Sequence, residues 1–400
     1  MKILLVNKFL YPRGGAETYT LKIGEQLKKM GHEVQYFGMY DTKNIVGNCY
    51  GLYTANMELH NWSLSSITYP IHIIYSFEAK KKIKELIKKF KPDIVHLNNI
   101  NFHLTPSIIE GAKECSVKIV QTVHDLQMLC PNHLMLSTDL HICSKCLDGN
   151  YMHCIKGSCI HDSRIKSICG AMEASLYQKR NTYRLIDKFI CPSQFMERML
   201  TQKDIYKTKT ITIHNFIDID IPDIITKKED YILYFGRLSE EKGIGMILDL
   251  AKHLQTQIYI AGTGPMQEAC EKSDYVKYIG FKTGNELMEL ISRAKLTLYP
   301  SIWYENCPMS ILESQSLGTP VIASNLGGIK ELIQDGITGY TIPEITSEKM
   351  NQKIEELIND NDKLVYMSQK CKESKSINLE TYTSLLIDEY KKILNRRDDY

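Results

Sequence analysis

Residues 299–328, YPSIWYENCPMSILESQSLGTPVIASNLGG, contain the pattern that decides the fold. They predict the end of a β-prone strand, a loop, a short helix and the beginning of the next strand. Asn306 is the expected helix cap, Pro308 belongs in the first turn, and Gly318 ends the helix before residues 320–323 resume a strand. A helix that begins directly after a strand and a loop presents unpaired N–H groups and a positive dipole end, which suit a phosphate.

Two glutamates accompany this helix start: Glu305 lies in the loop before it and Glu313 lies within it. Carboxylates accept hydrogen bonds from paired hydroxyl groups, so the two glutamates suit a ligand that carries neutral hydroxyls beside its phosphate. Glutamates are common on protein surfaces, and the alternative is that Glu313 is a solvated helix residue and Glu305 a loop charge. The rest of the chain helps to decide whether Glu305 and Glu313 bind a ligand or lie on the surface.

Other segments of the chain repeat the order of strand, loop and helix. Residues 2–6 form a continuous apolar run, as expected of a parallel strand covered on both faces, and the glycine pair at 14–15 precedes a helix. Residues 231–235 likewise lead into the loop 236–243 and a further helix. This pattern predicts two doubly wound α/β domains in series, with a hinge near residues 195–230.

The overall composition excludes several classes of protein. The chain of 400 residues is too long for one ordinary core, and its formal net charge of +2 gives no general case for a nucleic-acid partner. No apolar run approaches the roughly 20 residues that span a bilayer, and residues 1–17 predict a first strand and not a signal peptide. Twelve cysteines in a chain of this length indicate a reducing compartment, and we expect a cytoplasmic location.

Charged residues at predicted strand ends are candidates for binding an anion. Arg237 and Lys242 lie in the loop after one strand, where Arg offers a planar fork and Lys a compact point charge for phosphate oxygens. His124 and Asp125 follow the strand at residues 118–123, and open α/β sheets place their ligands beside such strand ends. The alternative is that all four are surface or structural residues.

Several short motifs occur in a fixed order along the chain. They are GGAE at residues 14–17, HD at 124–125, PS at 192–193, GRLSEEKG at 236–243, AGTGP at 261–265, and Glu305 and Glu313 with seven residues between them. In this combination, nearly the whole chain resembles the retaining glycosyltransferases of family 4, which have the GT-B fold. The tract YENCP at 304–308 departs from the glycine-rich form of that loop and resembles a variant found in transferases that act on surface polysaccharides.

The resemblance implies a fold class and domain boundaries. The fold would be α/β of the GT-B type, with two doubly wound Rossmann-like domains that face each other across a cleft. Residues 1–200 would form the N-terminal, acceptor-side domain, with a cysteine-rich insertion at about 126–170. Residues 201–375 would form the C-terminal domain that binds a nucleotide-sugar, and a last helix at about 376–400 would pack back on the first domain.

The resemblance also implies residue roles, with His124, Glu305, Arg237 and Lys242 as the catalytic group. Arg237 and Lys242 would hold the donor diphosphate and stabilise charge on the leaving group without a metal ion. Glu313 would bind the ribose hydroxyls, Glu305 the transferred sugar, and the backbone carbonyl of His124 would face the developing oxocarbenium ion. The other implied donor contacts are Gly15, Gly280, Phe281, Asn306, Cys307, Pro308, Met309 and Ser310.

The implied reaction moves a sugar from a nucleotide-sugar, most commonly a UDP-sugar, to a glycan or lipid-linked glycan acceptor in the biosynthesis of a polysaccharide such as a capsule. It requires no cofactor. Front-face attack, in which the leaving phosphate takes the acceptor proton, needs no enzyme carboxylate as nucleophile and differs in this from the paired carboxylates of glycosidases. Two alternatives share the architecture: a nucleotide-sugar 2-epimerase, for which no acid/base set can be assigned, and an inactive carbohydrate- or nucleotide-binding protein.

The segment after His124 is an insertion that a simple βαβ unit does not need. It is rich in cysteine. The CSKC tract at 143–146 has the spacing of a zinc knuckle. The expected ligands of a structural zinc ion are Cys130, Cys143, Cys146 and Cys154, with Cys159 as the main competitor. The alternative is a set of free thiols packed in a loop.

Residues 62–77 are apolar and aromatic, and they lead into residues 80–90, KKKIKELIKKF, which predict an amphipathic helix whose lysines cover one face. One interpretation is an ordinary surface helix of the α/β layer. The other is a patch that rests on anionic lipid at the inner face of the plasma membrane, where each lysine contributes on the order of 1 kcal/mol.

Overall fold

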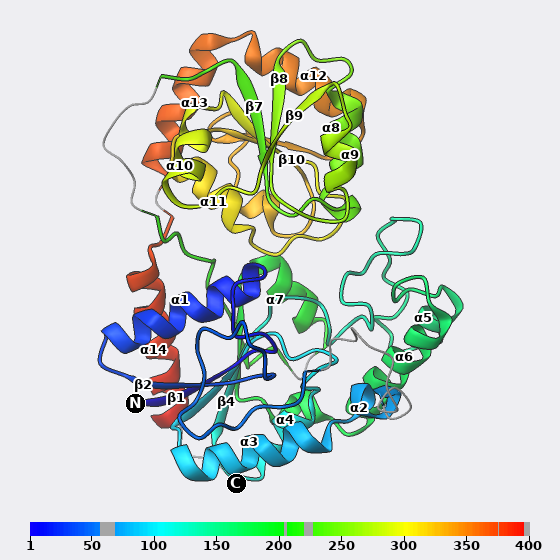
Figure 1. Cartoon of the computed structure of the whole chain (residues 1–400), viewed down its shortest axis with the longest axis vertical. Coiled ribbons are helices and arrows are strands. Elements are labelled where there is room, and N and C mark those ends of the chain that lie inside the picture. Colours follow the sequence, from blue (N-terminus) through cyan, green and yellow to red (C-terminus); the bar gives the residue numbers. More distant parts are fainter. Residues whose placement is uncertain (57–68, 204–205, 220–226, 375, 396–400) are drawn as a thin grey trace. The chain divides into compact units, whose positions relative to one another are not determined.

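Two structural units make up the part of the chain that the computed structural model describes, which is residues 1–56, 69–203, 206–219, 227–374 and 376–395. Unit 1 comprises Met1–Asp139, Cys143–His214 and Leu379–Tyr400, and unit 2 comprises Leu140–Ile142 and Asn215–Asn378. Each unit contains a parallel sheet of six strands with helices packed on it (Figure 1). The predicted fold class, two doubly wound α/β sheets in series, is confirmed.

The sheet of unit 1 has the strand order β2-β1-β3-β4-β5-β6. The strands are β1 Lys2–Val6, β2 Glu33–Phe37, β3 Ile94–Leu97, β4 Lys118–Thr122, β5 Lys188–Cys191 and β6 Thr210–Thr212. Ile3 pairs with Val34 on one side and Ile94 on the other, and the side chains of β1 from Ile3 to Val6 are fully buried. A strand covered on both faces needs apolar residues at successive positions, which is why β1 reads KILLV.

Helices of unit 1 pack on this sheet and on one another, with α6 contacting α2 and α5. They are α1 Gly15–Lys29, α2 Tyr69–Ile74, α3 Phe77–Phe90, α4 Ser107–Lys113, α5 Met152–Lys156, α6 Arg164–Lys179, α7 Gln194–Thr201 and α14 Leu379–Asn395, with a 3-10 turn at Thr182–Leu185. The last helix, α14, lies beside α1, and the hydroxyls of Tyr19 and Tyr382 are 2.8 Å apart (Figure 1). The C-terminal segment is thus part of the first sheet's packing.

The sheet of unit 2 has the strand order β12-β11-β10-β7-β8-β9. The strands are β7 Tyr231–Phe235, β8 Gln257–Ala261, β9 Val276–Gly280, β10 Leu296–Tyr299, β11 Val321–Ser324 and β12 Gly339–Ile342. The helices are α8 Ile244–Leu250, α9 Gln267–Glu271, α10 Gly284–Arg293, α11 Met309–Ser316, α12 Ser347–Ile358 and α13 Asn361–Glu373, with 3-10 turns at Glu240–Lys242 and Ile329–Glu331.

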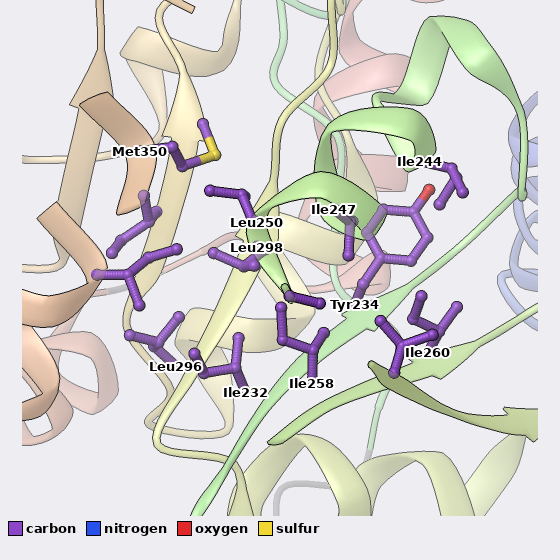
Figure 2. Packing of buried hydrophobic residues seen from close by; sticks show 14 of the residues in the cluster. Ile232, Tyr234, Ile244, Ile247, Leu250, Ile258, Ile260, Leu296, Leu298 and Met350 are labelled. Carbon is purple, nitrogen blue, oxygen red and sulfur yellow. The ribbon is translucent and has the colours of Figure 1, made fainter. Parts of the chain in front are cut away.

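The core of unit 2 forms where α8 and α12 lie against the sheet. Figure 2 shows Ile232, Ile258 and Leu298 of the strands packed beneath Ile247 of α8 and Met350 of α12, all with 0% exposure. Burying one such side chain contributes about 1.5–3 kcal/mol. This packing fixes the sheet whose strand ends carry the candidate site.

The beginning of α11 differs from the sequence prediction. Asn306 is not the helix cap: the N-cap residue is Pro308, with φ −65° and ψ 119°, and no side chain caps the helix. Because Pro308 is extended, the loop that contains Glu305 continues for two more residues before the helix begins at Met309. Among the helices of the described residues, none combines the length and the apolar character that crossing a bilayer requires.

Candidate active site

The winding direction of the unit 2 sheet reverses between β7 and β10, which are neighbouring strands. Open α/β sheets bind ligands at the carboxyl ends of the strands beside such a reversal. The loops that follow these two strands, residues 236–243 and 300–308, meet there, and the N–H of Ile302 donates to the carbonyl of Glu241 at 3.0 Å. The reversal therefore brings the predicted residues of both loops to one place.

Glu305 is a buried carboxylate at this place, and one of its oxygens receives three hydrogen bonds. Nζ of Lys242 lies 2.6 Å from Oε1, and Oγ of Ser301 and Nε1 of Trp303 each lie 2.8 Å from it. Oε2 accepts no hydrogen bond from any residue that the structure describes. The carboxylate is thus anchored through one oxygen and presents the other as a free acceptor.

The surroundings keep the Glu305 carboxylate ionised. Burial by itself would raise its pKa, but the ammonium of Lys242 and the hydrogen bonds from Ser301 and Trp303 outweigh burial and hold the pKa below its usual value. Lys242 also lies over the indole of Trp303, with Nζ 5.0 Å from the ring centroid. It is held between an anion and an aromatic face, and 21% of its side chain stays exposed.

Two glycines permit the close approach of these loops. Gly243 has a φ of +78°, and a Cβ there would lie 2.0 Å from the carbonyl oxygen of Pro300. Gly327 has a φ of +64°, and a Cβ there would lie 2.1 Å from the carbonyl oxygen of Glu305. A larger residue at either position would force the loop that carries Glu305 to move.

Arg237 lies in the same loop as Lys242 and has an exposed side chain. Its backbone carbonyl accepts a hydrogen bond of 2.7 Å from the hydroxyl of the buried Tyr234, which fixes the loop at the end of β7. Its guanidinium has no ion-pair or hydrogen-bond partner in the described part of the chain. The planar fork is therefore available to an anionic ligand.

Glu313 lies in α11, and its half-buried carboxylate has no hydrogen-bond partner among the described residues. Burial raises its pKa to about 7. Tyr299, at the end of β10, lies near both glutamates: burial, then Tyr234, Glu313 and Glu305, raise its pKa well above the usual value. A carboxylate left without a partner in such a setting is stabilised when a ligand hydroxyl donates to it.

Cys307 anchors the loop between Glu305 and α11 by its buried contacts. Cys307 is 4% exposed, its carbonyl accepts from Nδ2 of Asn215 at 2.7 Å, and burial raises its pKa to about 12. It packs with Ile217 and Leu312, so its thiol serves packing and is not reactive. The other predicted donor contacts of this loop are half-buried around it: Asn306, Pro308, Met309 and Ser310.

Gly280 and Phe281, at the end of β9, are the residues predicted to lie near a nucleotide base. The carbonyl of Gly280 accepts the N–H of Gly262 at 3.0 Å, which ties the ends of β8 and β9 together. The side chain of Phe281 is 67% exposed, and no atom lies within 4 Å of the position that a Cβ on Gly280 would take. An exposed aromatic ring beside open backbone offers a surface on which a flat ring stacks.

In unit 1 the predicted His124 follows β4 and is half-buried. Its Nε2 lies 3.0 Å from Oδ1 of Asn98, and its ring meets Tyr19 edge to face at 4.9 Å between centroids. Burial lowers the pKa of His124 to about 4, so the imidazole is neutral near pH 7 and Nε2 donates to the Asn98 oxygen.

A buried chain of hydrogen bonds supports the ring against which His124 packs. The hydroxyl of Tyr19 contacts Oγ1 of Thr122 at 3.0 Å and the hydroxyl of Tyr382 at 2.8 Å. His96 joins the same Thr122 at 2.8 Å and reaches the hydroxyl of Tyr390 in α14. Two tyrosines of α14 thus fix the hydrogen-bonded chain that positions Tyr19, the ring in contact with His124.

Gly15 begins α1 at the reversal point of the unit 1 sheet, where β1 lies between β2 and β3. The loops after β1 and β3 lie side by side, and the N–H of Lys8 donates to the carbonyl of Asn99 at 2.8 Å. No atom lies within 4 Å of the position of a Cβ on Gly15. The backbone at the start of α1 is therefore open.

The structure joins several of the predicted site residues within unit 2, and the others belong to unit 1. Lys242 contacts Glu305 directly, and Arg237 lies in the same loop as Lys242. Tyr299 lies near both Glu305 and Glu313. His124 and Gly15 belong to unit 1. Asn98 directly follows β3, the position at which open α/β sheets place ligands, and its contact with His124 comes from the structure. Sequence reasoning missed Ser301 and Trp303, and their place in the loop after β10 was the available signal.

The predicted zinc ligands are not arranged as a metal site. Over the described residues, no group of three or more His, Cys, Asp or Glu side chains is placed to hold a metal ion. Cys130, Cys143, Cys146 and Cys154 are free thiols. Zinc binding stays a prediction.

Two sequence families match this chain. Residues 13–221 match Glycosyltransferase Family 4, and residues 218–374 match Glycosyl transferases group 1. An uncharacterised 42.6 kDa protein in the cps region of Klebsiella pneumoniae is 25% identical over 353 residues, which cover 83% of this chain and 87% of that protein. The amylovoran biosynthesis glycosyltransferase AmsK of Erwinia amylovora is 30% identical over 130 residues, which cover 28% of this chain and 32% of AmsK.

The fold is shared with HepE of Anabaena, solved in complex with UDP and with UDP-glucose. The TM-score is 0.69 at 17% sequence identity, and the match covers 98% of this chain and 100% of HepE. This likeness shows the GT-B fold. Because the Family 4 match alone spans residues 13–221, more than half of the chain, this protein belongs to glycosyltransferase family 4.

Proposed function

We propose that this enzyme transfers a sugar, with retention of anomeric configuration, from a UDP-sugar to a glycan or lipid-linked glycan in polysaccharide biosynthesis. The observation that carries the proposal is the state of Glu305. Three donors from Lys242, Ser301 and Trp303 anchor Oε1, and Oε2 has no donor among the described residues. An ionised carboxylate with one open oxygen suits the hydroxyls of a donor sugar.

The positive groups beside Glu305 suit a diphosphate. Lys242 is partly neutralised by Glu305 at 2.6 Å, whereas the exposed guanidinium of Arg237 has no counter-ion in the described part of the chain. A diphosphate bound by both groups would have the charge that develops on its leaving oxygen stabilised by fixed cations. Catalysis by this route requires no metal ion.

Residues beside the diphosphate groups suit the nucleoside part of the donor. Phe281 and the open backbone of Gly280 offer a surface for a base, and Glu313 offers an unpaired carboxylate for ribose hydroxyls. HepE, which shares the fold, was solved with UDP and with UDP-glucose. These observations support a UDP-sugar as the donor.

Retention by front-face attack is consistent with how Glu305 is held. A carboxylate oxygen that accepts hydrogen bonds from an ammonium and two further donors is a poor nucleophile, because those bonds stabilise its negative charge. In the proposed step the acceptor oxygen bonds to the anomeric carbon, the bond from that carbon to the phosphate oxygen breaks, and the phosphate takes the acceptor proton. The roles of His124 and Gly15 in this step stay predictions.

Two relatives support polysaccharide biosynthesis as the pathway. One belongs to the cps region of Klebsiella pneumoniae, and AmsK of Erwinia amylovora acts in amylovoran biosynthesis. For such a pathway we propose a glycan or a lipid-linked glycan as the acceptor of this enzyme.

A peripheral contact with anionic membrane also stays a prediction, and the ion pairs of α3 weaken it. Lys82 pairs with Glu78 at 2.7 Å, and Lys84 pairs with Glu114 at 2.5 Å. Lysines neutralised by neighbouring glutamates attract anionic lipid less than free ones. Residues 62–68 of the apolar stretch that precedes this helix lie outside the described residues.

The test is a ligand panel of UDP, GDP, ADP, CMP and their sugars on the full chain. We expect the melting temperature to rise with uridine compounds only, because a ligand that binds the folded state stabilises it. Arg237→Ala should reduce the rise at each ligand concentration, because the variant binds the nucleotide more weakly. Arg293→Ala is the matched control, because it removes one positive charge outside the candidate site. Arg293 ends α10 on the surface and pairs at 2.7 Å with Glu229, which lies just before β7.

Product analysis separates the three candidate activities. A transferase gives free UDP and a glycan longer by one sugar, whose anomeric configuration NMR determines. An epimerase gives an altered sugar without any acceptor. A rise in melting temperature without turnover on any acceptor would favour the binding protein, and no rise with any nucleotide would refute the proposed donor site.

A further inference from the structure

Five cysteines of unit 1 line one cavity, and we call them the thiol cluster. The cavity has a volume of about 150 Å³ and is formed by the loops that follow β4. The thiol cluster comprises Cys130, Cys143, Cys146, Cys154 and Cys159, all with free thiols. Cys169 lies in the same cysteine-rich segment, yet it does not contribute to the wall of the cavity.

The fold holds these cysteines together independently of any bond between their sulfurs. Asn132 is the central brace: its Oδ1 accepts from the thiol of Cys130 at 2.9 Å, and its Nδ2 donates to the carbonyls of Leu136 at 2.6 Å and Cys159 at 3.4 Å. The N–H of Cys143 donates to the carbonyl of Met135 at 2.8 Å. Residues from separate turns are therefore brought to one cavity by backbone and amide contacts.

The thiols of the cluster are free, so none of them is already used in a disulfide. A thiol that coordinates a metal loses its proton and binds as the thiolate. The cavity thus groups side chains of the kind that a thiophilic cation binds.

Cys159 and Cys154 are neighbours that differ in their exposure and in their tie to Cys130. The amide of Asn132 accepts from the thiol of Cys130 and donates to the carbonyl of Cys159, so one side chain links these two cysteines. Cys159 is half-buried, whereas Cys154 is 1% exposed and packs in the same apolar cluster as Cys146, Tyr151 and Ile160. The link through Asn132 and the greater exposure favour Cys159 as a partner of Cys130.

We propose that the thiol cluster is a structural site for a thiophilic divalent cation, zinc in the cell, bound by Cys130, Cys143, Cys146 and Cys159. Cys159 thereby replaces Cys154 of the set that the sequence suggests. Tetrahedral thiolate coordination is the usual form of a structural zinc site. The CSKC turn supplies two ligands at the spacing of zinc knuckles, and the other two come from turns braced by Asn132.

Binding exchanges four thiol protons for one Zn²⁺ and forms four sulfur–zinc bonds. The resulting net charge of the site is negative, and Lys145 on the wall of the cavity offsets part of it. Because no metal-holding arrangement exists among the described residues, the four sulfurs must move inward from the wall to zinc–sulfur distances of about 2.3 Å. The cavity provides the room for this movement.

The role of the site would be to brace the segment that follows His124. The carbonyl of Cys130 accepts the N–H of His133 at 2.9 Å, and Nδ1 of His133 lies 3.6 Å from Oδ2 of Asp125. A cation fixed to Cys130 would therefore steady the turn that orients Asp125, the neighbour of His124. This inference does not depend on the donor or acceptor of the proposed reaction.

The test measures metal in the full chain, purified under reducing conditions without chelator. We expect one zinc per chain by elemental analysis, and expect chelation to free four further thiols for titration. Cobalt(II) added to the stripped protein should give an intense sulfur-to-cobalt absorption band at one equivalent. Serine at Cys130, Cys143, Cys146 or Cys159 should abolish or weaken the band, whereas Cys169→Ser and Cys154→Ser should retain it.

Because a serine variant can fail to fold, the wild-type cobalt titration decides the proposal by itself. Absence of both zinc and the cobalt band would overturn it. Equal loss of the band in Cys169→Ser would also overturn it, and loss in Cys154→Ser but not in Cys159→Ser would overturn the assigned set. Formation of disulfides in place of metal binding, seen as a loss of two mass units per bond, would make the cluster a redox element and refute the site.

The affinity of the cluster for zinc or cobalt should fall as the pH is lowered, because protons compete with the metal for the thiolates.

Discussion

Replacing Lys242 with methionine isolates the ion pair on which the proposed function rests. Methionine retains the unbranched side chain and its contact with Trp303, but it removes the positive charge that lies 2.6 Å from Glu305. The side chain of Glu305 is 7% exposed and that of Lys242 is 21% exposed, so the carboxylate loses its partner in a largely dry site. Removing one partner of a fully buried pair costs about 3–5 kcal/mol. Because Ser301 and Trp303 still donate and Lys242 is partly exposed, we expect about 2–3 kcal/mol here.

The loss should depend on pH in a direction that the pKa of Glu305 sets. In the wild type this pKa lies below the ordinary value of 4.5, so the ionised carboxylate stabilises the fold above about pH 4.5, and the stabilisation is lost as the pH falls through the lowered pKa. In Lys242→Met, burial should prevail and raise the pKa above 4.5. The variant should then lose stability as the pH rises through that raised value. The difference between the two proteins should be large at pH 7 and small at pH 4.

The assay is urea unfolding of the full chain from pH 4 to pH 7, followed by a probe in unit 2. Lys242→Met, Glu305→Gln and the double variant form a cycle, and the double variant should be more stable than the sum of the single losses predicts, by about 1–3 kcal/mol. Turnover of Lys242→Met should fall about 10²–10³-fold at every pH, since a fixed charge at the leaving group is lost. A stability loss that does not change with pH, or a coupling near zero, would refute the ion-pair reasoning.

Three further predictions concern residues around the same site. Arg237→Ala should weaken UDP binding by about 10-fold or more, since a charged hydrogen bond is worth about 1.5–3 kcal/mol, and should leave stability unchanged because the side chain is exposed. Glu313→Gln should stabilise the free enzyme at pH 8 by about 1 kcal/mol yet weaken nucleotide binding. A pKa raised to about 7 means that the wild type loses stability as the pH rises from 4.5 to 7, and glutamine removes this loss. Gly327→Ala should cost more than the roughly 1–2 kcal/mol of a left-handed residue, because its Cβ would meet the Glu305 carbonyl at 2.1 Å.

Each of these has a control and a result that would contradict it. Arg293→Ala should bind UDP like the wild type, and equal weakening would show that Arg237 acts only through net charge. Isothermal titration and pH-dependent melting measure Glu313→Gln, and an unchanged pH profile would contradict the raised pKa. Gly336→Ala matches Gly327→Ala in its φ of +75° but meets no atom closer than 3.9 Å, so equal losses in the two variants would remove the clash from the explanation.

Prediction from the sequence succeeded where the determinants are local. Strands such as β1 and β7 are apolar at successive positions because both of their faces are covered, and that pattern is visible without a structure. It failed at the start of α11, where Asn306 was the expected cap. The local pattern did not show that Asn215 would hold Cys307 or that Pro308 would be extended, which moves the beginning of the helix to Met309.

The sequence by itself determined the order of strands and helices, the family resemblance and the residue types of the candidate site. Only the tertiary structure decided how those residues are paired. Lys242 and Glu305 are 63 residues apart in the chain, and they meet because β10 lies beside β7 at the reversal of the sheet. The pairing of strands, unlike their existence, depends on packing across the whole unit, and so do burial and the protonation of Glu305 and Glu313 that follows from it.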